Sequence, residues 1–164
     1  MNETILTHNG STVTLERVIN APKDNVWEAY ASADIFEKWF STDGWTTSVK
    51  HFDFTAGGYI LFVMKCEDKN QEMFGQESWN KFEYKSITPK DTFTYIDSFS
   101  DKDGNAVPGM PSTEVTVSLE EHGNATKIAS VSVFGSEEGL QQALAMGMEE
   151  GIKQTFNKLA EVIE

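Results

Sequence analysis

The residues from Ser136 to Ile163, SEEGLQQALAMGMEEGIKQTFNKLAEVI, decide the fold. Their apolar side chains recur every three or four positions, which is the spacing of one face of an α-helix. Ser136 is a favourable N-cap, and the two acidic residues after it suit the positive end of a helix. The stretch therefore predicts one amphipathic helix of about seven turns. Its apolar face comprises Leu140, Leu144, Met148, Ile152, Phe156 (or Thr155), Leu159 and Ile163.

Three glycines interrupt this predicted helix, namely Gly139, Gly147 and Gly151. Each costs up to about 1 kcal/mol relative to alanine in a helix interior. Gly147 and Gly151 are one turn apart, so they flatten one face of the helix. We expect a strand or a ligand to approach the helix at this face.

The residues before the helix predict one strand, two short helices and then a run of strands. Pro22 suits the first turn of the first short helix, and Ser32 is the expected N-cap of the second. Residues 1–10 are polar, and we expect them to form a loose tail. The predicted strands, each bounded by turn residues, are Ser11–Ile19, Trp45–Phe54, Tyr59–Cys66, Phe74–Ile87, Thr92–Phe99, Thr113–Glu120 and Thr126–Val133.

This order predicts an α+β fold in one domain spanning residues 1–164. We expect a curved, antiparallel, seven-stranded sheet around the C-terminal helix, with the two short helices after the first strand. One long helix can cover so wide a sheet only if the sheet curls around it. That geometry leaves space for an internal cavity between sheet and helix.

The formal net charge of -13 argues against nucleic acid and anionic membrane surfaces as partners. The single cysteine, Cys66, excludes an internal disulfide. No apolar run reaches membrane-spanning length, and the N-terminus does not resemble a signal peptide. We therefore expect a cytoplasmic protein.

The sequence lacks the residue spacing typical of metal sites, and it lacks the common catalytic motifs. His8, His51 and His122 have no second ligand three or four positions away, and we expect no metal and no cofactor. Nucleophile elbows, phosphate loops and dinucleotide fingerprints are also missing. Glu77 is the carboxylate whose burial would be most informative, although exposure to water is the simpler expectation. We assign no catalytic residue.

Aromatic and methionine residues on the predicted elements are the positive evidence for a ligand site. Methionine adapts to varied apolar shapes, which suits a binding pocket. These side chains could instead simply fill the core, and for any single residue that alternative is favoured. Tyr95 or Asn80 could orient a ligand by hydrogen bonding. The candidate ligand-binding residues are Trp39, Phe62, Met64, Trp79, Phe82, Tyr95 and Met148.

Several segments, in matching order, resemble one known family. The chain resembles the SRPBCC (START-like) superfamily, in the branch of homologues of the activator of the heat-shock chaperone ATPase (AHSA1-like). The resemblance spans roughly Val13 to Ile163. The segments that carry it are Val18–Pro22 with Val26-Trp27, Trp39–Gly44, Phe52–Gly58, Tyr59–Met64 and Tyr84–Pro89.

This resemblance implies a helix-grip (START/Bet v 1-like) fold with a cavity, and no single activity. The chain departs from the family pattern at Thr42, at Thr55-Ala56 and at Ile152, where the family often has Pro, Arg-Pro and Trp. These departures lie near turns or on the helix face. They therefore prevent transfer of a particular ligand.

Three functions remain open from the sequence. The leading hypothesis is binding of a small hydrophobic molecule in the internal cavity. The first alternative is a co-chaperone-like or stress-response interaction module, with a protein partner or a second copy of the chain. The second alternative is a cavity enzyme of the cyclase or hydrolase type. A buried ionisable group in the cavity would favour the enzyme.

Overall fold

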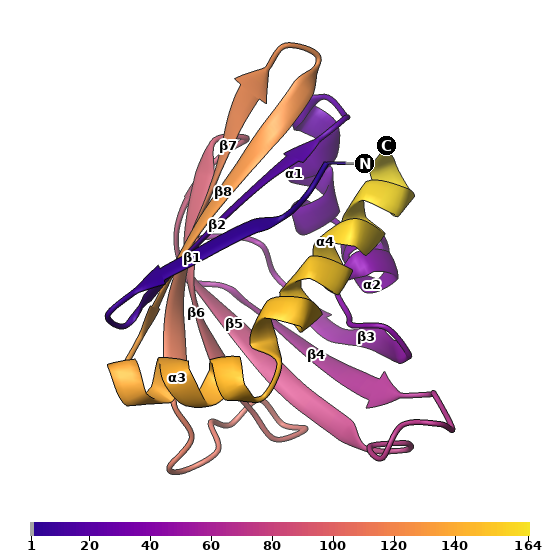
Figure 1. Ribbon diagram of the computed structural model, residues 1–164, viewed down its shortest axis with the longest axis vertical. Helices are drawn as coiled ribbons and strands as arrows, with labels where there is room; N and C mark the ends of the chain where they lie inside the picture. The colour runs from indigo at the N-terminus through magenta and orange to yellow at the C-terminus, as the bar shows by residue number, and fades with distance from the viewer. Residues whose placement is uncertain (1) are drawn as a thin grey trace.

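The computed structural model describes residues 2–164, which form one curved sheet and four helices (Figure 1). The helices are α1 (Lys23–Ala31), α2 (Ala33–Trp39), α3 (Glu137–Ala145) and α4 (Met148–Ile163). The strands are β1 (Ile5–Asn9), β2 (Thr12–Ile19), β3 (Trp45–Phe52), β4 (Tyr59–Cys66), β5 (Glu77–Thr88), β6 (Thr92–Phe99), β7 (Ser112–His122) and β8 (Ala125–Phe134).

The sheet has the order β1-β2-β8-β7-β6-β5-β4-β3, and all neighbouring strands are antiparallel. Figure 1 shows that α4 crosses its concave side, with α1 and α2 beside one end of the helix. The predicted α+β helix-grip architecture is therefore confirmed. In β2, Val13, Leu15 and Arg17 are buried and face the interior, as the alternation of side chains along a strand requires.

The sheet has eight strands instead of the seven predicted, because residues near the N-terminus form β1. Ile5 pairs with Glu16 and Asn9 pairs with Thr12 across a turn at Gly10, whose φ is +61°. The predicted loose tail is therefore wrong for Ile5–Asn9. Backbone pairing at a sheet edge forms this strand despite its polar sequence, since its outer side chains face water.

The predicted single C-terminal helix is wrong, because two helices replace it. Gly147, between α3 and α4, has a φ of +91°, in the left-handed region that side-chain-bearing residues rarely adopt. The chain changes direction there. As a result, α3 lies across the bottom of the sheet, and α4 crosses the concave side of the sheet (Figure 1). Ser136 caps α3 as predicted, accepting a hydrogen bond from the Gly139 amide at 3.0 Å.

The two short helices follow the sequence prediction. Pro22 precedes α1, and the Ser32 hydroxyl accepts a hydrogen bond from the Ile35 amide at the start of α2. Their apolar faces pack against the sheet. The side chains buried there are Val26, Trp27, Ala29, Tyr30, Phe36 and Trp39.

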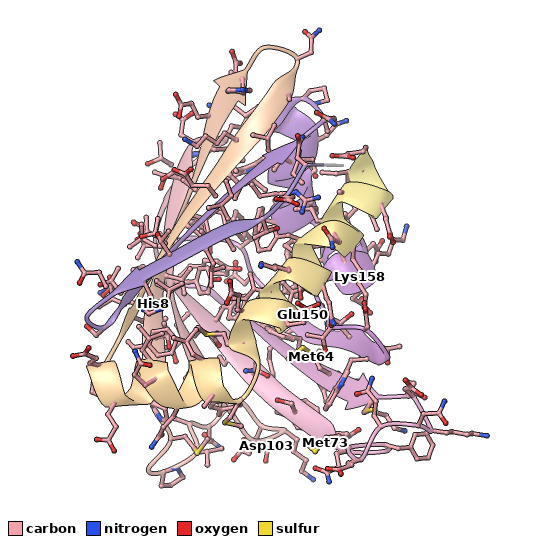
Figure 2. The ribbon with its side chains drawn as sticks, viewed as in Figure 1. His8, Met64, Met73, Asp103, Glu150 and Lys158 are labelled. Carbon is pink, nitrogen blue, oxygen red and sulfur yellow. The ribbon has the colours of Figure 1, made fainter. Side chains whose placement is uncertain are left out.

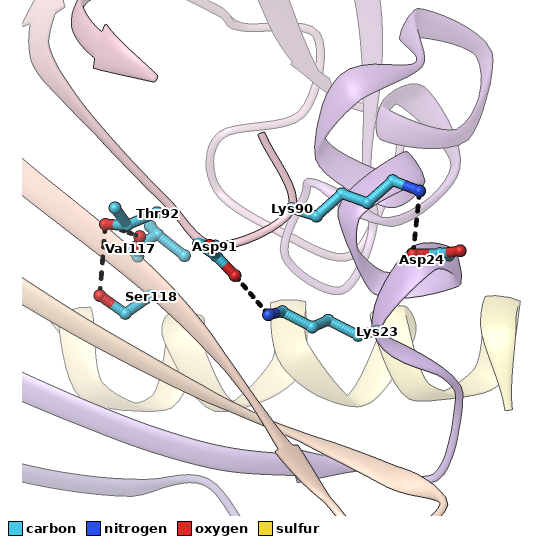
Figure 3. Close-up of polar contacts among 7 residues, drawn as sticks. All are labelled: Lys23, Asp24, Lys90, Asp91, Thr92, Val117 and Ser118. Carbon is cyan, nitrogen blue, oxygen red and sulfur yellow. Dashed lines mark hydrogen bonds and ion pairs between the residues drawn. The ribbon is translucent and has the colours of Figure 1, made fainter. Parts of the chain in front are cut away.

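Polar contacts hold the start of α1 against the β5–β6 turn (Figure 3). Lys23 pairs with Asp91, and Lys90 Nζ lies 3.2 Å from Asp24 Oδ1. In the adjacent strands, the Thr92 hydroxyl donates to the Val117 carbonyl oxygen at 2.8 Å. These contacts fix α1 over the sheet, and α1 carries Tyr30 toward the interior.

Candidate ligand-binding cavity

A cavity of about 510 Å³ lies between the concave face of the sheet and the helices. Strands β2, β4, β6, β7 and β8 form one wall, and α1, the segment that follows α2 and both C-terminal helices form the other. Most of the lining side chains are apolar. They include Val13, Leu15, Phe40, Met64, Val115, Val117, Phe134, Met148, Ile152 and Phe156.

The break between α3 and α4 shapes the cavity, because Ala143, Met146 and Gly147 contribute to its lining. Met146 is 88% exposed, so this part of the lining borders water. Figure 2 shows Met64 beneath the first turns of α4, close to Glu150 in this view. The helical wall is therefore made by the two turns of α4 nearest the break and by the end of α3.

Gly151 brings α4 close to the segment that follows α2. A Cβ atom at Gly151 would lie 3.2 Å from the Thr42 Cγ2 atom, so a larger residue would push the two segments apart. Polar contacts secure the same approach: the Thr155 hydroxyl donates to the Ser41 carbonyl oxygen at 3.1 Å, and Lys158 Nζ donates to the Thr42 carbonyl oxygen at 2.7 Å. The flat face at Gly151 thus receives a backbone segment at the edge of the cavity.

Strand β6 places a carboxyl group in the cavity. Tyr95, Asp97 and Phe99 alternate onto the concave face and line the cavity together. Burial raises the pKa of Asp97 from 3.8 to about 7, while the nearby Asn80 side chain has a smaller opposite effect, since its amide can donate a hydrogen bond to the carboxylate. Asp97 therefore exchanges a proton near neutral pH.

Two tyrosines add hydroxyl groups to the lining. The Tyr30 hydroxyl is buried and has no hydrogen-bond partner in the structure. Burial raises the pKa of Tyr30 and of Tyr95, and the charge of Asp97 adds to the increase for Tyr95. Both phenols therefore stay protonated over the physiological range and can donate a hydrogen bond.

Three of the seven sequence-predicted site residues line the cavity: Met64, Tyr95 and Met148. Met64 and Met148 face it from the sheet and from α4, as the stripe on the helix predicted. Asn80, the other predicted polar group, is buried beside Asp97 and accepts a hydrogen bond from the Ser78 hydroxyl at 3.1 Å. It does not itself line the cavity.

The other four predicted residues do not line the cavity. Trp39, Phe62 and Phe82 lie in the aromatic core beside the cavity, where the Phe62 and Phe82 ring centroids are 5.0 Å apart. The Trp39 indole nitrogen donates to the Ala29 carbonyl oxygen at 2.9 Å, which fixes its ring in the core. Trp79 neighbours the inward-facing Asn80 on β5, so strand alternation places it on the opposite face.

Asp97 is the site residue that the sequence analysis missed. A signal for it exists, because Phe93, Tyr95, Asp97 and Phe99 occur at every second position of one predicted strand. An acidic residue in an otherwise aromatic strand face indicates a buried carboxyl group. Glu77, the carboxylate singled out instead, is exposed at the start of β5.

The remaining candidate side chains lie outside the cavity. His51 is exposed and stacks on Tyr59, with ring centroids 4.1 Å apart. Cys66 is buried at the end of β4. Within residues 2–164, no three His, Cys, Asp or Glu side chains gather in a way that could hold a metal ion.

A sequence profile of one family matches residues 20–164, and it is described as "Activator of Hsp90 ATPase homolog 1-like protein". The chain belongs to this family. The match confirms the resemblance found in the sequence, and it covers every element of the activator-like fold except β1 and β2. A search of curated protein sequences finds no significant match.

Solved structures share the activator-like fold over almost the whole chain. Protein Ms6760 from Mycobacterium smegmatis has 24% identity and a TM-score of 0.86, covering 99% of this chain and 97% of its own. A protein from Arthrobacter aurescens has 25% identity and a TM-score of 0.86, with coverages of 96% and 90%. One from Staphylococcus epidermidis has 26% identity and a TM-score of 0.83, with coverages of 96% and 92%.

Among residues 2–164, the structure contains no helix with the length and apolar character needed to cross a bilayer.

Proposed function

We propose that this protein binds a small hydrophobic molecule in the cavity between the sheet and the C-terminal helices. The observation that carries the proposal is the cavity of about 510 Å³ with a mainly apolar lining. Small-molecule sites typically have volumes of about 300–1,000 Å³ and few polar groups. A ligand in this cavity would gain about 25 cal/mol for each Å² of apolar surface removed from water, before the costs of association.

The arrangement of the core supports this proposal. The aromatic core that contains Trp39 and Phe62 adjoins the cavity, and Phe40 and Phe156 contribute to both. The packed core therefore forms part of the cavity wall and holds its shape. Met64 and Met148 are adaptable walls for ligands of varied shape.

Nile red, a neutral dye whose fluorescence rises in apolar surroundings, tests the proposal directly. We expect the purified protein to bind the dye with saturation and dodecan-1-ol to displace it. Ser132→Trp should weaken dye binding at least about tenfold, because a large ring at this lining position fills the cavity. Native mass spectrometry of freshly purified protein would identify a co-purified ligand.

Val131→Trp is the matched control, since Val131 is the neighbouring residue on β8 and is 39% exposed on the opposite face. This variant should bind the dye like the parent. Absence of saturable dye binding to the parent would contradict the proposal. Equal binding by both tryptophan variants would place the dye elsewhere on the protein.

A cavity enzyme is the second candidate, because Asp97 is an ionisable group of the kind that general acid–base catalysis uses. Its raised pKa, about 7, suits proton transfer near neutral pH. A substrate would have to place its reacting atom next to this carboxyl group. Turnover of a bound ligand that is lost in Asp97→Asn, with ligand binding retained, would favour the enzyme over a binding protein.

The interaction module with a chaperone-like partner stays a prediction from the family resemblance. A homodimer and a cytoplasmic location stay predictions from the sequence. Size-exclusion chromatography with light scattering tests the homodimer. A monomer at micromolar concentration would contradict it.

A further inference from the structure

The cavity is lined by one acidic residue and by no basic residue within the part of the chain that the structure describes. Asp97 provides the acidic group, and no Lys, Arg or His side chain belongs to the lining. Among residues 2–164, no ion pair involves Asp97. The cavity therefore contains a carboxyl group without a counter-ion.

The side chains next to Asp97 on the neighbouring strands are uncharged. Phe82 and Asn80 approach from β5, and Thr113 is the paired residue on β7. Tyr95 is the titratable neighbour on the same strand, and its raised pKa keeps it neutral. A half-buried carboxylate on an apolar strand face is costly to ionise without a charged partner, so a cationic ligand group would offset this cost.

Aromatic side chains line the same cavity as Asp97. Tyr95 and Phe99 flank Asp97 on the same face of β6 and line the cavity with it. Tyr30, Phe40, Phe134 and Phe156 line it from other elements. Ammonium groups are attracted to the faces of aromatic rings, and more strongly where water is excluded. A carboxylate among aromatic rings thus favours an amine over a neutral polar group.

The Tyr30 hydroxyl is a second, independent indication of a ligand. It is buried and has no hydrogen-bond partner, and the residue, 6% exposed, lines the cavity. Buried hydroxyl groups in proteins are usually paired. A polar atom of a bound ligand would satisfy this hydroxyl group.

We infer that the cavity selects apolar molecules that carry a protonated amine, with Asp97 as the residue that determines this selectivity. This inference rests on the proposed function, since it specifies the ligand class of the same cavity. Molecules with a carboxylate or phosphate group are disfavoured, because they would lie near Asp97 without a basic side chain to pair with. The net charge of -13 acts in the same direction, since it attracts cations and repels anions at a distance.

Three ligands with the same alkyl chain test the inference: dodecylamine, dodecan-1-ol and dodecanoate, each below its micelle-forming concentration. Each is titrated into the protein–Nile red complex near pH 8, in buffer of moderate ionic strength. We expect dodecylamine to displace the dye at a concentration at least about tenfold lower than dodecan-1-ol does, which is the scale of one charge-assisted contact. Dodecanoate should be the weakest of the three.

Asp97→Asn should weaken dodecylamine binding by about tenfold and leave dodecan-1-ol binding nearly unchanged. Asp103→Asn is the matched control, because this exposed carboxylate lies in the loop between β6 and β7 (Figure 2). It removes the same charge from the surface and should leave the preference for the amine intact. Added salt screens surface attraction more than a buried pair, so the preference should persist in salt.

Acidification gives an independent readout. Dodecylamine binding should weaken as the pH falls below about 7, because the Asp97 carboxylate takes up a proton while the amine stays charged. Dodecan-1-ol binding should change little over the same range.

The failure of this inference differs from the failure of the proposed function. Equal affinities for the amine and the alcohol, unchanged by Asp97→Asn, would overturn the amine selectivity while the cavity still binds apolar ligands. Loss of the amine preference in Asp103→Asn would also overturn it, by assigning the effect to surface charge. Absence of binding by all three ligands and the dye would overturn the proposed function itself.

Discussion

Asp97 is a single residue that affects both stability and binding. Its carboxyl group lies on an apolar strand face, and burial raises its pKa from 3.8 to about 7. The folded protein therefore binds the proton more tightly than the unfolded chain does. Between these two pKa values, the carboxyl group is ionised in the unfolded chain and protonated in the folded protein. The contribution of Asp97 to stability therefore falls as the pH rises from about 4 to about 7.

Asp97→Asn should raise the free energy of unfolding at pH 8 by at most about 4 kcal/mol. The asparagine amide is uncharged, so the folded protein no longer holds an ionised carboxylate on an apolar strand face. The gain should shrink toward about pH 5, where Asp97 in the folded protein is largely protonated. Urea unfolding followed by circular dichroism at several pH values measures both effects. A variant less stable than the parent at pH 8 would show that the carboxylate has a stabilising partner.

Met148 and Leu159 differ in their surroundings although both belong to the apolar stripe of α4. Leu159 is fully buried, so Leu159→Ala should lower the free energy of unfolding by about 2–5 kcal/mol. Met148 borders the cavity and is half-buried, so Met148→Ala should cost less than about 2 kcal/mol and change the affinity for Nile red. Chemical denaturation and dye titration compare the two variants.

Comparable large losses of stability in both variants, without dye binding to the parent, would contradict this distinction. The cavity would then be filled by side chains in solution, and Met148 would be an ordinary core residue.

At the residue level, periodicity predicted which side chains face the interior, and their role in ligand binding stays a prediction. Strand alternation and the helical stripe placed Met64, Tyr95 and Met148 on elements that face the cavity. Trp39 and Phe62 face the interior as well, but both pack against Phe36, and no sequence pattern encodes such contacts. Periodicity predicts which face is buried and leaves open which part of that face is packed.

At the scale of elements, the break between α3 and α4 depends on Gly147. A periodic apolar stripe continues through this position, so the sequence pattern favoured one helix. The left-handed φ of +91° breaks it, and Gly147 has open space around the position of a Cβ atom. The penalty for a side chain at this position is therefore set by the backbone conformation alone.

Gly147→Ala should lower the free energy of unfolding by about 1–2 kcal/mol, the usual cost of a left-handed residue with a side chain. Gly147→Asn should be milder, because asparagine tolerates this conformation better. Thermal or urea unfolding of the two variants measures the difference. Equal stability of parent and alanine variant would indicate that α3 and α4 can join into the continuous helix that the sequence predicted.

Strand β1 illustrates a second limit of sequence patterns at this scale. The outward exposure of Ile5 and the polar residues around it resemble a tail, and only pairing with β2 makes this segment a strand. Backbone hydrogen bonds at a sheet edge need no particular side chain. The six predicted strands from Trp45 to Val133, in contrast, carry alternating or continuous apolar residues and agree with β3 to β8 within a few residues.

At the scale of the whole molecule, we expect folding without a metal ion. The sequence has no ligand cluster, and no grouping of His, Cys, Asp or Glu in residues 2–164 offers one. Treatment with EDTA should therefore leave the melting temperature unchanged within about 1 °C. A decrease of several degrees that added metal reverses would contradict this prediction and indicate a site formed by fewer side chains.

The attachment of α4 differs between its two ends. Leu159 and Ala160 are fully buried, and Lys158 is bonded to the segment after α2, whereas Met148 to Glu150 lie beside the cavity and solvent. One helix should thus show a gradient of amide hydrogen exchange, slow beyond Thr155 and fast near the break. A ligand in the cavity would slow exchange mainly in the first turns. Exchange rates along α4 would therefore report occupancy of the cavity, without a label on the ligand or the protein.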